Sequence, residues 1–105
     1  MKPEEAIARL KEEFPNQNRY IDLAKHCIGL DRKKPYTRHS RKFYRPYRNY
    51  YYVKEDNEKW SVLENAGYAS HLTSNSPGYA SFYLTREGLD WLGEQLGIYI
   101  YDEEN

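Results

Sequence analysis

Residues that start or stop helices recur at short intervals along the chain and divide it into short elements. Pro3, followed by two glutamates, is typical of a helix start, because proline suits the first helical position and acids favour the positive end of the helix dipole. Glycines that fit the ends of helices follow at three positions: Gly29, Gly67 and Gly97. The chain has 105 residues and no long linker, so a single domain over residues 1–105 is predicted.

Two short helices are expected at the N-terminus. The first runs up to Pro15, which stops it. Its apolar face consists of three residues at helical spacing: Ile7, Leu10 and Phe14. Asn16 or Asn18 caps the second helix, which ends at Gly29. Its apolar positions are Tyr20, Ile21, Ala24, Cys27 and Ile28. The two are predicted to form a helical hairpin.

The C-terminal half predicts a helix, a β-hairpin and a second helix. Asp56 or Asn57 can cap the first of these helices, and Thr85 can cap the second. Between them, the turn residues "SNSPG" separate two runs that can pair as strands, residues 68–72 and 79–84. The side chains expected in the core are Trp60, Leu63, Phe82, Leu84, Leu89 and Leu92. The tail "IYIYDEEN" is expected to add a short strand.

Two segments, "WSVLENAGYASHL" and "SFYLTREGLDWL", resemble the second half of a winged-helix domain. The resemblance covers roughly residues 56–97 and implies an α+β fold: a small winged-helix-like domain with an N-terminal helical hairpin, a β-hairpin wing and a C-terminal helix. A winged helix usually has an early strand, then two helices, then the wing. Here the early strand candidate, residues 50–53, lies directly before the third helix. The helix expected between them is missing, unless residues 43–49 supply it.

A second resemblance rests on "IGLD", "YRNYY", "LENAGYA" and "FYLTREG". Their order is similar to that of a family of small, uncharacterised phage and prophage proteins, over most of residues 28–92. This resemblance implies a phage context and no defined activity.

Charge is strongly segregated along the chain. Residues 32–54 hold nine Lys or Arg residues, half of the twelve tyrosines, and no Asp or Glu. The formal net charge is zero, so the remainder of the chain is at −9. Pro35 and Pro46 argue against one continuous helix through the stretch. A short turn of helix near residues 43–49 and a strand over residues 50–53 are expected there.

The basic aromatic stretch predicts a nucleic-acid interface over residues 32–48, because phosphates attract cations and bases stack on aromatic rings. The candidates for phosphate contact are Arg32, Lys33, Lys34, Arg38, Arg41, Lys42, Arg45 and Arg48. The candidates for stacking or packing are Tyr36, Phe43, Tyr44 and Tyr47. Two alternatives are open: the cations pair with the acidic remainder of the chain, or they bind an acidic protein.

The predicted function is a phage- or prophage-type nucleic-acid-binding regulator or accessory protein, with DNA as the expected form of nucleic acid. The alternative is a protein-binding modulator, such as a phage-encoded inhibitor of a host or defence protein. A structural phage component with no separate activity is a third hypothesis. In a winged-helix arrangement, His71 or Asn75 of the wing could reach a minor groove. However, the tip has no Arg or Lys, and an ordinary hairpin turn explains "SNSPG" fully.

No sequence pattern indicates catalysis. There is no nucleophile motif, phosphate loop or zinc-ligand spacing, so no catalytic residue, metal or cofactor is predicted. The single Cys indicates a reducing compartment. Without a signal peptide or a run of about 20 apolar residues, no membrane partner is expected and the predicted location is cytoplasmic.

Overall fold

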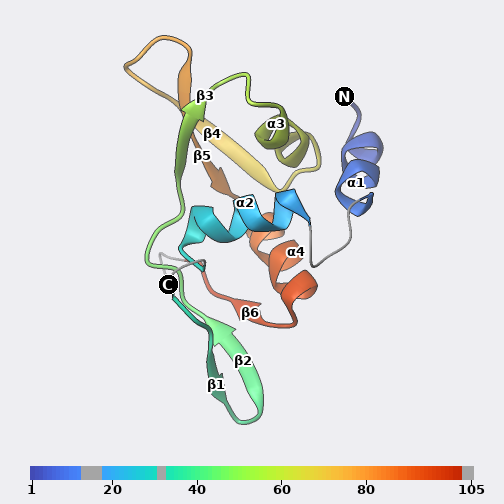
Figure 1. Ribbon diagram of the computed structural model, residues 1–105, viewed down its shortest axis with the longest axis vertical. Coiled ribbons are helices and arrows are strands. Elements are labelled where there is room, and N and C mark those ends of the chain that lie inside the picture. Colours follow the sequence, from blue (N-terminus) through green and yellow to red (C-terminus); the bar gives the residue numbers. More distant parts are fainter. Residues whose placement is uncertain (13–17, 31–32, 103–105) are drawn as a thin grey trace.

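The computed structural model describes residues 1–12, 18–30 and 33–102, and over them the chain is α+β, as predicted (Figure 1). Its helices are α1 (Pro3–Lys11), α2 (Arg19–Ile28), α3 (Glu58–Asn65) and α4 (Arg86–Leu96). Its strands are β1 (Tyr36–Arg38), β2 (Arg41–Tyr44), β3 (Tyr51–Lys54), β4 (Ala69–Thr73), β5 (Tyr79–Leu84) and β6 (Tyr99–Ile100). They form two three-stranded sheets, in the orders β1-β2-β6 and β3-β5-β4.

The first two helices begin as the sequence predicts. Pro3 is the first residue of α1, and two glutamates follow in its first turn. Asn18 caps α2, because its side-chain oxygen accepts hydrogen bonds from the backbone N–H groups of Tyr20 and Ile21, at 2.9 and 3.2 Å. The predicted roles of Phe14, Pro15 and Asn16 lie outside the described residues.

The predicted hairpin of the two N-terminal helices is wrong, because α1 packs mainly against α3. Ala6 and Leu10 are the buried residues of α1. A hydrogen bond of 2.8 Å from the Asn18 side-chain nitrogen to the Leu10 carbonyl oxygen joins the end of α1 to the start of α2. The apolar face of α2 instead covers α4 and β5. The apolar face of α2 is therefore not available to α1, and the apolar face of α1 packs against α3.

The C-terminal half forms the predicted β-hairpin. β4 and β5 pair antiparallel around the turn at residues 74–78, and β3 pairs with the other side of β5. Alternate residues of a strand face opposite sides of the sheet, and Phe82 and Leu84 on β5 face the core. The other predicted core residues are also buried: Trp60, Leu63, Leu89 and Leu92.

A network of hydrogen bonds joins the start of β4 to the start of α4. Thr85 caps α4 by accepting a 3.1 Å hydrogen bond from the Gly88 N–H, while its hydroxyl donates to the Gly67 carbonyl oxygen at 2.8 Å. The Thr85 N–H donates to the Tyr68 carbonyl oxygen at 3.1 Å. A Cβ atom at Gly88 would lie 1.9 Å from that oxygen, so this close approach requires glycine.

Asn49 extends the β3-β5-β4 sheet beyond its last backbone pair. Its side chain accepts a hydrogen bond from the Leu84 N–H and donates one to the Leu84 carbonyl oxygen, both at 2.9 Å. The Tyr50 N–H donates to the Cys27 carbonyl oxygen at 3.2 Å. The helical turn predicted near residues 43–49 is therefore wrong: this segment completes β2 and then runs without a helix to Asn49.

The helices around the β3-β5-β4 sheet differ from the winged-helix order. Residues 55–68, all of them described, hold a single helix, α3, where a winged helix has two. The winged-helix arrangement therefore remains a prediction, and the established class is α+β.

Candidate nucleic-acid interface

The basic stretch forms a β-hairpin, which the sequence analysis did not predict. β1 and β2 pair antiparallel, with Thr37 opposite Lys42 and Arg38 opposite Arg41. The two turn residues, His39 and Ser40, both have positive φ angles, of 53° and 64°. This is the backbone that a two-residue type I′ turn requires, and its twist matches that of the paired strands. We call residues 33–45 the basic hairpin.

The basic hairpin projects from one end of the molecule. The principal extents are 45 × 31 × 20 Å, and the β1–β2 turn lies at one end of the longest axis (Figure 1). The turn of the β4–β5 hairpin lies at the opposite end (Figure 1). β6 pairs parallel with the C-terminal part of β2, so the hairpin is fixed to the rest of the fold at its base. Its outer half has no covering element among the described residues.

The cations of the basic hairpin are exposed and do not pair with described carboxylates. Six side chains share this property: Lys33, Lys34, Arg38, Arg41, Lys42 and Arg45. In the described part of the chain, a Glu64 carboxylate oxygen contacts His71 and Asp90 forms an ion pair with Arg86, and neither contact involves these six. Among the described residues, no carboxylate neutralises these six cations. Arg32 lies outside the described residues.

Three of the predicted site residues make contacts at the base of the hairpin. The Tyr47 ring lies so close to Gly29 that a Cβ atom there would be 2.3 Å from a ring carbon. The Lys33 ammonium lies 4.7 Å from the centre of that ring. Arg48 Nη2 donates a 2.7 Å hydrogen bond to the His26 carbonyl oxygen in the last turn of α2. A cation near a helix C-terminus is favourable, so Arg48 has a structural role at this position.

Tyr44 is a correction to the predicted stacking residues. Its ring is buried, and its hydroxyl donates a 2.8 Å hydrogen bond to the Ile28 carbonyl oxygen at the end of α2. The Tyr44 carbonyl oxygen accepts a 2.9 Å hydrogen bond from the Tyr101 N–H. A ring in this position joins the hairpin to α2 and cannot stack on a base.

One face of the β1-β2-β6 sheet carries a row of stacked rings. Phe43 stacks on Tyr36 of β1, with ring centres 5.9 Å apart, and on Tyr101 after β6, at 6.1 Å, both at an interplanar angle of 26°. Because β2 lies between β1 and β6, the two tyrosines flank Phe43 on opposite sides. The Arg45 guanidinium carbon lies 4.5 Å from the centre of the Tyr101 ring. We call these four side chains the aromatic column.

Tyr99 and Tyr101 are members of this surface that the sequence analysis missed. Tyr99 is opposite Phe43 in the strand register, and its ring meets Tyr101 edge-on at 4.8 Å. The signal was the alternation of the tail "IYIY", which places both tyrosines on the same side of a strand. The tail lies far from the basic stretch in sequence, so its pairing with β2 could not be read from either segment alone.

The two residues predicted to reach a minor groove, His71 and Asn75, lie in different positions on the β4–β5 hairpin. His71 lies on β4, where its Nδ1 is 2.6 Å from a Glu64 carboxylate oxygen and its ring packs on Phe82. Asn75 is exposed at the turn. Next to the turn, the hydroxyl of Tyr52 lies 3.0 Å from the Ser74 hydroxyl. Hydrogen bonds from Ser74 and Ser76 lower the pKa of Tyr52.

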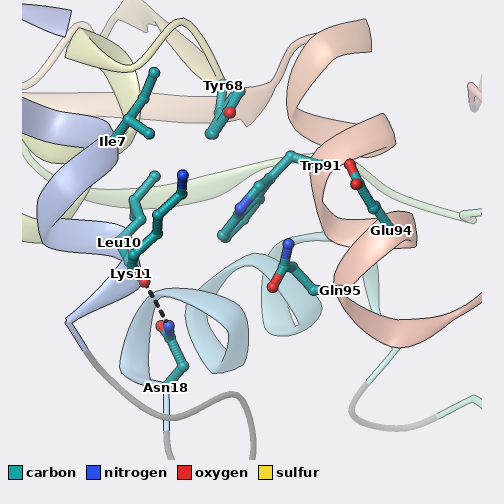
Figure 2. A pocket seen from close by; sticks show the side chains of 8 residues that line it. All are labelled: Ile7, Leu10, Lys11, Asn18, Tyr68, Trp91, Glu94 and Gln95. Atoms are coloured by element: carbon teal, nitrogen blue, oxygen red, sulfur yellow. Dashed lines mark hydrogen bonds between the residues drawn. The ribbon is translucent and has the colours of Figure 1, made fainter. Parts of the chain in front are cut away.

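A pocket of about 390 Å³ lies between α1, α2 and α4 (Figure 2). Figure 2 shows Lys11 and Glu94 projecting from opposite sides, with the Trp91 ring between them. Trp91 stacks on Tyr68, and the Asn18 amide is held by its hydrogen bond to Leu10. The described lining contains no Ser, Thr, Cys or His. Its charged side chains are Lys11 and Glu94.

Comparison of the chain with protein-family models, curated proteins and solved structures finds no match. The phage and winged-helix resemblances therefore stay predictions. Over the described ranges, no helix is long and apolar enough to cross a membrane. Within the same ranges, no three His, Cys, Asp or Glu residues gather as a metal-binding cluster.

Proposed function

We propose that this chain is a nucleic-acid-binding regulator or accessory protein that contacts phosphates through its basic hairpin and has no catalytic activity of its own. The observation that carries the proposal is the set of six exposed cations on residues 33–45, none of which pairs with a described carboxylate. Exposed cations on a projecting element are the electrostatic footprint expected of a phosphate-binding surface.

The shape of the hairpin supports the same proposal. A two-stranded β-ribbon fits the major groove of duplex DNA, and a basic surface with aromatic rings suits a single strand. DNA is the first candidate for the nucleic acid. The resemblance of "IGLD", "YRNYY", "LENAGYA" and "FYLTREG" to phage and prophage proteins supports a phage context for this role.

The proposal is tested by reversing the charge of Arg38, Arg41 and Lys42 together to Glu. All three are exposed and lie on the hairpin away from its base, so folding should survive. Affinity is measured for duplex and single-stranded DNA and for RNA, at several salt concentrations. If about five hairpin cations contact phosphates, log affinity for duplex DNA should fall with log salt at a slope of about −4.5, and the triple variant should flatten it to about −1.8.

The matched control changes Lys2, Arg9 and Lys59 to Glu, which alters net charge equally but outside the hairpin. Its slope should stay near that of the unmodified protein, because the number of phosphate contacts is unchanged. Equal losses from both triple variants would show that only total charge matters. Absence of binding to every nucleic acid at low salt would refute the proposal.

A protein-binding modulator is the second candidate, and a different surface favours it. The outer face of the β3-β5-β4 sheet exposes Leu72 by 65%, together with Tyr52 and Tyr79. The rings of Tyr52 and Tyr79 stack on each other with centres 5.5 Å apart. An exposed apolar group of this kind suits a protein contact. In this alternative, Leu72→Glu would abolish partner binding, whereas the charge reversals on the hairpin would not.

A further inference from the structure

We infer that the aromatic face of the basic hairpin binds an unpaired nucleotide, so that the ligand is single-stranded nucleic acid in preference to a duplex. This inference rests on the proposed function and adds the class of nucleic acid and the residue that receives a base. It concerns Tyr36, at the open end of the aromatic column, and the two arginines beside the turn.

The aromatic column is closed at one end and open at the other. At the closed end, the Arg45 guanidinium covers Tyr101. At the open end, one face of Tyr36 lies against Phe43, and no other described ring or cation contacts it. Tyr36 is 45% exposed although it is a large aromatic side chain. Its second face is therefore available to a further planar group.

Two arginines lie beside the aromatic column, on the side of the β1–β2 turn. A shallow pocket of about 530 Å³ is lined by Tyr36, Arg38, His39, Arg41, Phe43 and Tyr101. This volume falls in the range of small-molecule sites, so one nucleotide fits. Arg38 and Arg41 are opposite each other in the strand register, on the same side of the ribbon as Tyr36 and Phe43. They can hold phosphate oxygens while the base contacts a ring.

The pairing state of the ligand follows from what Tyr36 offers. In a duplex, each base already has neighbours on both faces and cannot add an aromatic side chain without unstacking. A single strand exposes those faces. Stacking on an aromatic ring tolerates any base, because every base has a flat π-face. Phosphate contacts alone would not give this preference, because a duplex has the higher density of backbone charge.

The test compares two single DNA strands of the same length, about 12 nucleotides, which is within the usual site size of such surfaces. One carries thymine at every position, and the other is abasic, with phosphates but no bases. The unmodified protein should bind the thymine strand about tenfold more tightly than the abasic strand. Tyr36→Ala should remove most of that difference and leave affinity for the abasic strand unchanged.

Tyr50→Ala is the matched control, because Tyr50 is comparably exposed, at 57%, but lies outside the basic hairpin. It should preserve the preference for the thymine strand. Circular dichroism melts of both variants check that the fold is intact.

The outcomes separate this inference from the proposed function. Equal binding of the two strands, with a normal salt slope, would overturn the nucleotide pocket and leave phosphate binding in place. An equal effect of Tyr36→Ala and Tyr50→Ala would also overturn the pocket. Failure to bind either strand or a duplex at low salt would refute both the nucleotide pocket and the proposed function.

Discussion

The β1-β2-β6 sheet, which includes the basic hairpin, and the β3-β5-β4 sheet are both three-stranded and rich in tyrosine, yet they are held in opposite ways. β5 alternates buried and solvent-facing residues, and its inward side chains pack against α3 and α4. All three residues of β1 are exposed. The β3-β5-β4 sheet is thus ordered by its packing in the core. The basic hairpin is ordered by its turn, by the backbone hydrogen bonds between its strands and by a few contacts at its base.

Three residues of the sequence motifs have structural roles in the body of the protein and not at the proposed interface. Gly29, Asn49 and Thr85 are each explained by a close approach or a hydrogen bond within the body of the protein. None of them lies on the basic hairpin. Stability is therefore expected to depend on the body and binding on the hairpin, so that substitutions should change one and spare the other.

The largest expected effect is loss of stability from Leu92→Ala. Leu92 is completely buried on α4, so the substitution removes apolar contacts and leaves a cavity. The free energy of unfolding should fall by about 2–5 kcal/mol in a denaturant melt. The affinity of the folded protein for nucleic acid should be unchanged. A loss near zero would mean that α4 contributes little to the core.

Gly88→Ala should have the next largest effect. The new methyl group would lie 1.9 Å from the Tyr68 carbonyl oxygen, and a backbone atom cannot move aside as a flexible side chain can. The expected loss is about 1–3 kcal/mol of unfolding free energy. Glu87→Ala, on the exposed neighbour, is the control and should change stability by less than about 0.5 kcal/mol. Equal effects would contradict the close approach of β4 and α4.

Local signals predicted the body well because caps and turns act over a few residues. Asn18, Asn57 and Thr85 cap their helices as expected, and "SNSPG" forms the expected turn. The packing of α1 was not predictable in the same way. Its apolar face can pack on more than one partner, and in the structure α1 packs on α3 while α2 packs on α4 and β5.

The basic hairpin was missed for two physical reasons. Its turn, His39-Ser40, lacks the Asn-Gly or Asp-Gly pair that usually marks a two-residue turn with positive φ angles. β2 is also completed by β6, a parallel partner from the far end of the chain. The cations predicted as phosphate contacts are mostly exposed, but only the fold shows that Tyr44 is buried and that Tyr101 extends the aromatic surface.

The smallest expected effect comes from the hairpin turn itself. His39→Asn with Ser40→Gly replaces residues that adopt positive φ at a cost with residues that adopt it readily. The β1–β2 ladder should open less often, and its amide hydrogen exchange should slow by about fivefold, which corresponds to about 1 kcal/mol. The denaturant midpoint should not move. A clear rise in that midpoint would show that the hairpin unfolds together with the body, against the comparison drawn above.

The most direct test of a separate binding hairpin is an amide NMR titration with a single-stranded thymine oligonucleotide. Shift changes should concentrate on residues 36–42 and on Tyr99 and Tyr101, because these form the exposed cationic and aromatic face. Amides of α3, α4 and β4 should move little. Changes centred on the outer face of the β3-β5-β4 sheet, or no changes at low salt, would contradict the account.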